Sequence, residues 1–135
     1  MTETKIIQAT ESVFRENDRL AKKLRQKFAQ SGVLALNLVS SPGSGKTTIL
    51  ERTAADLKAE LKMGVVEGDQ QTSRDAERIA KTGISSIQIN TMSGCHLDAA
   101  MIAKAVDHFD LEDLDVLFIE NVGNLVCPAA FDLGE

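Results

Sequence analysis

The pattern of apolar and polar positions divides this chain into one long helix followed by alternating strands and helices. Over residues 5–30, apolar side chains recur at steps of three and four while charged residues fill much of the opposite face, which predicts an amphipathic helix. Ser31-Gly32 provides its C-terminal stop. Because this helical region, residues 1–32, precedes the first predicted strand, we expect it to be an appendage that packs either on the core or on a partner.

Short apolar runs bounded by glycine and polar residues predict four strands after that helix. The strands are expected at 33–39, 63–67, 84–90 and 116–120, and the helices in the stretch after Gly45, near 75–81 and at 98–108. The last strand is apolar almost throughout, which is typical of a strand buried on both faces. Strands separated by helices of this length imply right-handed crossovers, and therefore an α/β fold with a parallel sheet flanked by helices.

A glycine-rich turn directly follows the first strand. The run Ser41-Pro42-Gly43-Ser44-Gly45-Lys46-Thr47-Thr48 leads into a helix and contains Gly-Lys-Thr, which is the pattern of a phosphate-binding P-loop. Glycines there allow backbone N–H groups to face phosphate oxygens, while Lys46 reaches the β- and γ-phosphates and Thr47 ligates Mg²⁺. The full pattern has glycine where this chain has Ser40, so some backbone strain is expected at that position. The predicted nucleotide-binding residues are Gly43, Ser44, Gly45, Lys46, Thr47 and Thr48, with Lys46 also assigned a catalytic role.

Acidic residues end two of the predicted strands, at the sheet edge where α/β proteins bind ligands. Glu120 ends the fourth strand, and we predict that it holds Mg²⁺ and serves catalysis, with the Gly123 N–H near the γ-phosphate. The alternative is an ordinary carboxylate facing solvent. Asp69 follows the second strand and is a candidate Mg²⁺ or water-positioning group. Asp75 either joins it or stabilises the N-terminus of its own helix.

Two cysteines and a histidine form a second candidate site. Cys95 and His96 precede a predicted helix, whose N-terminus favours a thiolate, and Cys127 comes shortly after Glu120. Thiolate and imidazole donors suit Zn²⁺ and Ni²⁺, and a fourth ligand would come from water, another side chain or a second subunit. Adjacent ligands reach one ion only from an irregular segment. Because no CxxC or HxxxH spacing is present, two buried free thiols and an exposed histidine stay open as the alternative. His108 is expected to lie on the surface.

Composition argues against several classes of function. The 135 residues, 43% apolar and 26% charged, fit one globular domain with a modest core. A net charge of −5 provides no basic surface for nucleic acid. No apolar run approaches the roughly 20 residues that span a bilayer, and the polar start is not a signal peptide. We therefore expect a cytoplasmic protein without a membrane partner, in which reduced cysteines favour metal binding or chemistry over a disulfide.

Four motifs are informative together: the run 41–48, Glu67-Gly68-Asp69-Gln70-Gln71, Gly94-Cys95-His96-Leu97-Asp98-Ala99 and the run 118–128. In combination they resemble the HypB family of nickel-incorporating GTPases, which assist the assembly of [NiFe]-hydrogenases. The resemblance extends from the N-terminal helix to Glu135. It implies a nickel metallochaperone that binds and hydrolyses GTP, and the implied Mg²⁺ or switch residues are Thr47, Asp69, Asp75 and Glu120.

The same resemblance implies a Ni²⁺ or Zn²⁺ site made of Cys95, His96 and Cys127. The resemblance further implies that this site is shared between the subunits of a nucleotide- or metal-dependent homodimer. The implied partners are hydrogenase maturation accessory proteins and the hydrogenase large subunit.

The sequence also departs from the family pattern. The Asn-Lys-x-Asp segment that reads guanine is absent, as are the cysteine-rich N-terminal nickel motif and the histidine-rich stretch of some members. We therefore expect residues 33–135 to be the N-terminal part of a P-loop GTPase domain, with its C-terminal part missing and its base selectivity weak. Three other functions stay open: a nickel GTPase of the urease-accessory type, whose Cys-Pro-His motif is absent, a P-loop kinase, and a metal- or partner-binding protein without turnover.

Overall fold

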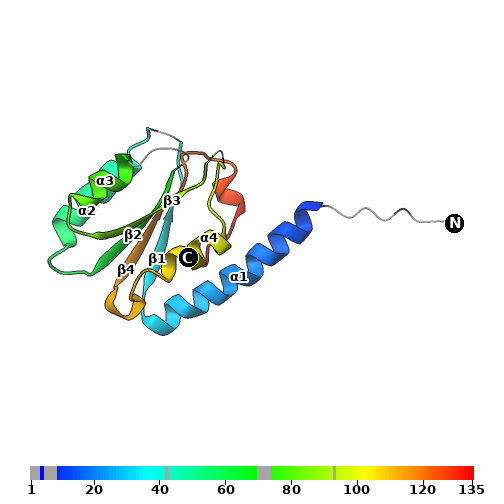
Figure 1. Cartoon of the computed structure of the whole chain (residues 1–135), viewed down its shortest axis with the longest axis horizontal. Coiled ribbons are helices and arrows are strands. Elements are labelled where there is room, and N and C mark those ends of the chain that lie inside the picture. The colour runs from blue at the N-terminus through cyan, green and yellow to red at the C-terminus, as the bar shows by residue number, and fades with distance from the viewer. Residues whose placement is uncertain (1–3, 5–8, 42, 70–73, 93) are drawn as a thin grey trace.

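A four-stranded parallel sheet forms the centre of the protein. The computed structural model describes residues 4, 9–41, 43–69, 74–92 and 94–135. The strands are β1 (Leu34–Leu38), β2 (Met63–Asp69), β3 (Ser85–Asn90) and β4 (Val116–Glu120), and they lie in the order β1-β4-β2-β3 (Figure 1). All three pairings are parallel, which confirms the predicted α/β class. Strand β2 is longer than expected because Gly68 and Asp69 pair with Ile89 and Asn90 of β3.

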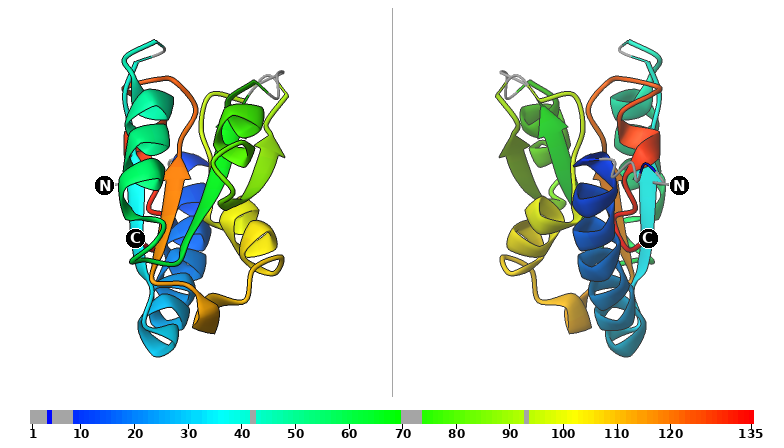
Figure 2. Two further views of the ribbon diagram at one scale, coloured as in Figure 1. Left: turned by 90° about the vertical axis from the view of Figure 1, so that its left-hand side faces the viewer. Right: turned by 90° about the vertical axis from the view of Figure 1, so that its right-hand side faces the viewer.

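Helices cover both faces of this sheet. Helices α2 (Lys46–Leu57) and α3 (Arg74–Ala80) lie on one face, whereas α1 (Ala9–Ser31) and α4 (Ala99–Val106) lie on the other (Figure 2). Two short 3-10 helices, η1 (Leu111–Asp113) and η2 (Pro128–Ala130), flank β4 in sequence. The N-terminal part of the first predicted helix, residues 5–8, falls outside the described residues. No helix within the described part is long and apolar enough to cross a membrane.

Helix α1 packs on the core, which is one of the two alternatives expected for it, and its buried residues make it part of the core and not an appendage. Its residues Ala21, Leu24 and Phe28 are buried in one cluster with residues of α4, β1 and β4. The physical reason is that α4 alone is too short to cover the apolar face of the sheet. The eight-residue α4 packs toward β3, and α1 covers the apolar surface toward β1. Burying side chains such as Leu24 and Phe28 contributes about 1.5–3 kcal/mol each.

Polar contacts fix the position of α1 relative to the C-terminal residues of the chain. The Asn17 side chain is buried; its amide nitrogen donates to the Asp132 carbonyl at 2.8 Å, and its amide oxygen accepts from the Ala99 N–H at 2.8 Å. Arg25 on the same helix forms a salt bridge with Asp132 at 2.6 Å, which keeps the pKa of that carboxyl below its usual value against the opposing effect of burial. Gly134 lies so close to α1 that a Cβ there would stand 2.7 Å from the Leu24 Cβ.

Strand β4 contacts both helical layers, because successive side chains of a strand point to opposite faces. Leu117 and Ile119 pack in the cluster with α1 and α4. Phe118 packs instead with Leu50 of α2 and Ile79 of α3. The burial of alternate residues on both faces confirms the prediction of a doubly covered strand, and it fixes which face the residues at the end of β4 must reach.

Replacing Asn17 with alanine should destabilise the fold. The change removes two hydrogen bonds and leaves the Ala99 N–H and the Asp132 carbonyl without that partner, so we expect a loss of about 1–3 kcal/mol in the free energy of unfolding. Urea unfolding measures it. The control is Asp18→Ala, the neighbouring exposed position, where we expect a change within about 0.5 kcal/mol. Equal midpoints for the two variants would contradict the prediction.

Candidate nucleotide and metal sites

The P-loop has the backbone that its sequence predicts. Gly43 has a φ of 72° and Gly45 a φ of 102°, and Gly45 caps the N-terminus of α2. A Cβ at either glycine would meet nothing within 4 Å, so these positions need glycine for their backbone conformation and not for lack of space. The expected strain at Ser40 is not found: Met92 is the one non-glycine residue with a positive φ in the described part of the chain. The Ser40 hydroxyl instead hydrogen-bonds that of Ser44 within the loop.

Thr47 and Glu120 meet at the start of α2. The Thr47 hydroxyl donates to Glu120 Oε1 at 2.5 Å, and the two residues are 6% and 3% exposed. The other carboxylate oxygen, Oε2, is buried and has no hydrogen-bond partner among the described residues. A hydroxyl beside a buried carboxylate with an unused oxygen is a donor set that suits Mg²⁺. The alternative of a solvent-facing carboxylate at position 120 is therefore wrong.

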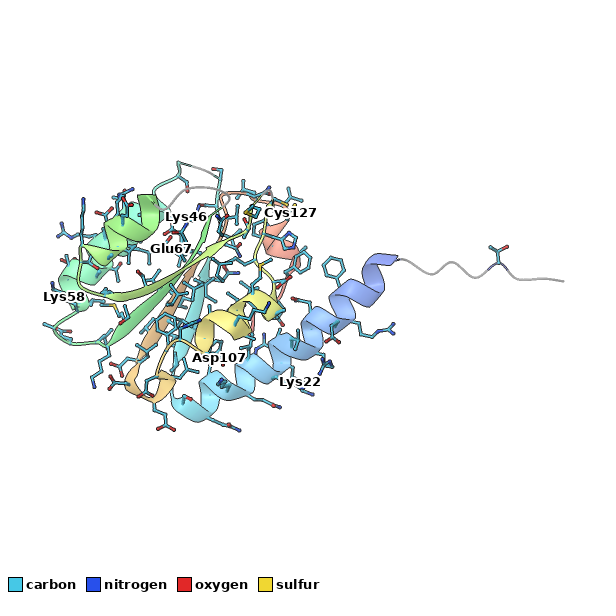
Figure 3. The ribbon with its side chains drawn as sticks, in the orientation of Figure 1. Lys22, Lys46, Lys58, Glu67, Asp107 and Cys127 are labelled. Carbon is cyan, nitrogen blue, oxygen red and sulfur yellow. The ribbon has the colours of Figure 1, made fainter. Side chains whose placement is uncertain are left out.

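A second buried carboxylate, Glu67, lies beside Glu120 and was missed as a site residue by sequence reasoning. Glu67 pairs in register with Glu120 and is 1% exposed. The period-two pattern of β2, in which Val65 faces α2 and α3, places Glu67 on that same face. This alternation was the available signal. Asp69 lies in β2 and Asp75 in α3, but their side chains fall outside the described part, so their roles stay predictions. Lys46 and Glu67 are labelled in Figure 3.

The loop of residues 121–127 runs from Glu120 past the P-loop to Cys127. Its backbone continues the contact with β1: the Asn121 N–H donates to the Leu38 carbonyl at 3.1 Å, and the Asn124 N–H donates to the Ser40 carbonyl at 2.9 Å. The Asn124 side chain accepts from the N–H groups of Val126 and Cys127 and so shapes the approach to the thiol. One short loop therefore connects the two candidate sites.

Cys95 lies next to both His96 and Cys127. Cys95 Sγ is 3.8 Å from His96 Nδ1, and the Cys127 thiol lies close enough to that of Cys95 to interact with it. The neighbouring Cys95 thiol, followed by desolvation, raises the pKa of the Cys127 thiol. Both cysteines are free and half-buried, and residues 94–97, which precede the predicted helix, are irregular as predicted. Asp98 follows them and caps α4 by accepting from the Met101 N–H.

The imidazole of His96 is held by an aromatic ring that the sequence pattern did not indicate. His96 stacks on Phe131 with ring centroids 4.0 Å apart and planes at 6°, and Phe131 also contacts Phe14 of α1. Nevertheless, no group of three His, Cys, Asp or Glu side chains in the described ranges is arranged to hold one ion. The structure thus pairs Cys95 with each of the other two predicted ligands, but it does not bring all three around one point.

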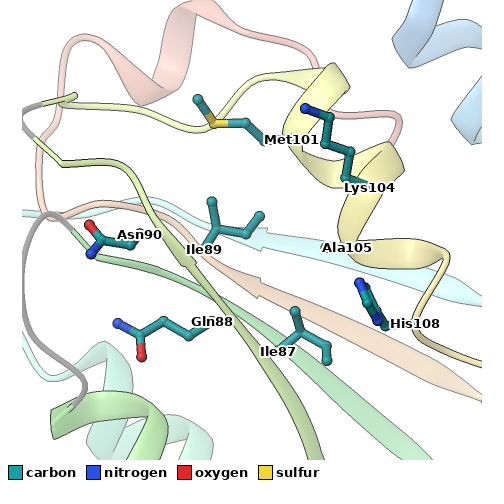
Figure 4. Close-up of a pocket in the computed structure, with 8 residues that line it drawn as sticks. All are labelled: Ile87, Gln88, Ile89, Asn90, Met101, Lys104, Ala105 and His108. Atoms are coloured by element: carbon teal, nitrogen blue, oxygen red, sulfur yellow. The ribbon is translucent and has the colours of Figure 1, made fainter.

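A pocket of about 310 Å³ lies elsewhere, between β3 and α4 (Figure 4). Ile89, Met101, Lys104 and His108 are among its lining residues, and His108 is exposed as predicted. None of the predicted nucleotide- or metal-binding residues lines it. The pocket therefore adds nothing to the two candidate sites.

Comparison with known proteins identifies the family. A model described as the CobW/HypB/UreG nucleotide-binding domain matches residues 34–133, which include the P-loop, β4 and the 121–127 loop. The chain belongs to this family. Within it, the whole chain is 58% identical to the hydrogenase maturation factor HypB of Rhizobium leguminosarum and 55% identical to that of Escherichia coli K12. The resemblance to HypB is thereby confirmed.

Solved HypB structures have the same fold. A crystal structure of HypB from Helicobacter pylori in complex with nickel matches with a TM-score of 0.81 and 50% identity, over 88% of this chain and 56% of that one. The chain covers 45% of the Rhizobium HypB and 47% of the Escherichia coli HypB. It therefore spans about half the length of the curated relatives that it matches.

Lys46→Ala should weaken nucleotide binding. The change removes a cation that is expected on the β- and γ-phosphates, and losing a charge-assisted hydrogen bond worth about 1.5–3 kcal/mol lowers affinity about 10- to 150-fold. Titration with a fluorescent nucleotide measures it. The matched control is Lys58→Ala, which removes a lysine just beyond the other end of α2, where it donates to the Thr82 carbonyl (Figure 3). Equal affinities in both variants would contradict the P-loop assignment.

Proposed function

We propose that this protein is a GTP-hydrolysing nickel-delivery factor for [NiFe]-hydrogenase assembly, in which GTP binds the P-loop and Ni²⁺ or Zn²⁺ binds Cys95, His96 and Cys127. The observation that carries the proposal is the continuity of the two sites. Glu120 hydrogen-bonds Thr47 of the P-loop, and seven residues further on the Cys127 thiol lies close to that of Cys95. A change at one end of this short segment is therefore positioned to act on the other.

On the nucleotide side, the chain supplies groups for binding, charge compensation and sensing. Lys46 and the N–H groups of residues 43–48 bind the phosphates. Thr47 and Glu120 would hold Mg²⁺, which supplies positive charge to the phosphate oxygens when bound. The Gly123 N–H is the group proposed to sense the γ-phosphate, and Asp69 and Asp75 are proposed switch residues.

On the metal side, the chain supplies two sulfur atoms and an imidazole, which suit Ni²⁺ and Zn²⁺. The 121–127 loop changes position between the GTP- and GDP-bound protein, because only GTP offers a γ-phosphate to Gly123. That movement shifts Cys127 relative to Cys95 and His96, so the number or geometry of metal donors changes. Three donors leave one position open, which a second subunit of a homodimer fills.

The names of the relatives support the biological setting of the proposal. Its partners are then hydrogenase maturation accessory proteins and the hydrogenase large subunit, and its compartment is the cytoplasm. The two free cysteines agree with a reducing compartment.

Nickel binding should depend on all three proposed ligands. Cys95→Ala, His96→Ala and Cys127→Ala should each lower the affinity for Ni²⁺ more than about 10- to 100-fold, the loss that removing even an outer-shell partner typically produces. Competition with a chromogenic chelator measures the affinity. His108→Ala is the control, because His108 is exposed beside the separate pocket and should leave the affinity unchanged. If all three variants bound Ni²⁺ with wild-type affinity, the two cysteines would be structural thiols and not metal ligands.

Glu120→Gln should slow GTP hydrolysis. Glutamine keeps an oxygen that accepts the Thr47 hydrogen bond but removes the negative charge, so we expect a higher Mg²⁺ requirement and a fall in kcat of about 10²-fold, typical for loss of one electrostatic group. Phosphate release at varied Mg²⁺ concentration measures both quantities. Hydrolysis at the wild-type rate and Mg²⁺ dependence would exclude a role for this carboxylate. Absence of turnover in the wild-type protein would favour the metal- or partner-binding alternative.

A further inference from the structure

The side chain of Asn121 connects three segments of the protein. Its Oδ1 accepts from the Leu97 N–H at 3.2 Å and from the Val122 N–H at 2.9 Å, and its Nδ2 donates to Asn37 Oδ1 at 3.1 Å. Two backbone N–H groups can only donate, so the amide orientation is fixed by its partners. Asn121 is 1% exposed, so breaking these bonds would leave buried polar groups unpaired.

Asn121 and Glu120 are adjacent, yet they contact opposite faces of the sheet. Glu120 reaches Thr47 at the start of α2, whereas Asn121 reaches Leu97 in the segment that leads into α4. Helices α2 and α4 cover different faces. A displacement at the end of β4 therefore moves one side chain on the nucleotide face and the next on the Cys95–His96 face.

Leu97 transmits such a displacement to the proposed metal ligands because it is tightly packed. Its side chain is completely buried and lies over Gly68 at the end of β2, where an added Cβ would stand 2.9 Å from Leu97 Cγ. His96 is the preceding residue, and its ring is held against Phe131. With so little free space, movement of the Leu97 backbone must move the residues that precede it.

We propose that Asn121 is a positioning residue that couples the occupancy of the P-loop to the geometry of Cys95 and His96. The inference rests on the proposed function and adds a second route to it: the 121–127 loop moves Cys127, and the Asn121 amide moves the other two ligands. The bond to Asn37 ties this amide to β1, the strand that leads into the P-loop.

The experiment measures a ratio, because loss of folding stability alone would not change it. Nickel affinity is determined by chelator competition in the full chain with Mg²⁺ and either GDP or a non-hydrolysable GTP analogue. In the wild-type protein we expect the two affinities to differ by about 5- to 150-fold, the usual range of allosteric coupling. In Asn121→Ala the ratio should fall to within about twofold of one, while nucleotide affinity without nickel is retained.

Two further variants keep the test decisive. Asn37→Ala removes only the link to β1 and should also reduce the ratio, so it decides the matter if Asn121→Ala does not fold. Asn17→Ala is the matched control: it removes a buried asparagine with two hydrogen bonds, but none to β1, β4 or the P-loop, and should keep the wild-type ratio.

The outcomes separate the inference from the function on which it rests. A wild-type ratio of one would overturn the proposed coupling itself. A wild-type ratio above one that persists in Asn37→Ala and in folded Asn121→Ala would leave the function standing and overturn the role of Asn121. If the affinity ratio fell equally in Asn17→Ala, the effect would be one of general destabilisation, and the proposed role of Asn121 would also be overturned.

Discussion

The hydrogen bond between Thr47 and Glu120 is the constraint on which the geometry of both candidate sites depends. A carboxylate that is almost fully buried is costly unless it is paired, so this bond fixes the end of β4 against the start of α2. Strand β4 lies between β1 and β2, with apolar residues packed on both of its faces, and cannot shift without disturbing both helical layers. The position of Glu120 is thus determined by the core and not by a flexible loop.

The position of Glu120 also determines where residues 121–127 begin. The Asn121 side chain points to the opposite face and accepts a hydrogen bond from the Leu97 N–H before α4. Residues 122–127 then run past the P-loop to Cys127, which lies close to Cys95. The two candidate sites are therefore the two ends of one short segment that begins where β4 ends. This arrangement suits coupling, because a small change in how the P-loop is filled acts on a part of the chain with few alternative positions.

Local patterns in the sequence were sufficient to predict the strands, the helices and the P-loop, because each depends on residues near one another in the chain. The Gly-Lys-Thr turn and the apolar run before Glu120 are features of this kind. Packing between distant segments was not predictable in the same way: α1 belongs to the core because of surface that β1 and α4 leave uncovered. Asn121 and Phe131 likewise matter through contacts with Leu97 and His96, which no spacing in the sequence reveals. Glu67, by contrast, was predictable from the alternation of β2, which places its side chain on the same face as that of Val65.

The central claim is that the nucleotide state changes the donors around the metal, and X-ray absorption at the nickel edge tests it most directly. Spectra of the nickel-loaded protein are recorded with Mg²⁺ and GDP and with a non-hydrolysable GTP analogue. Movement of Cys127 relative to Cys95 and His96 predicts a different number or distance of sulfur donors in the two states. Identical nickel coordination, with both nucleotides shown to be bound, would contradict the claim.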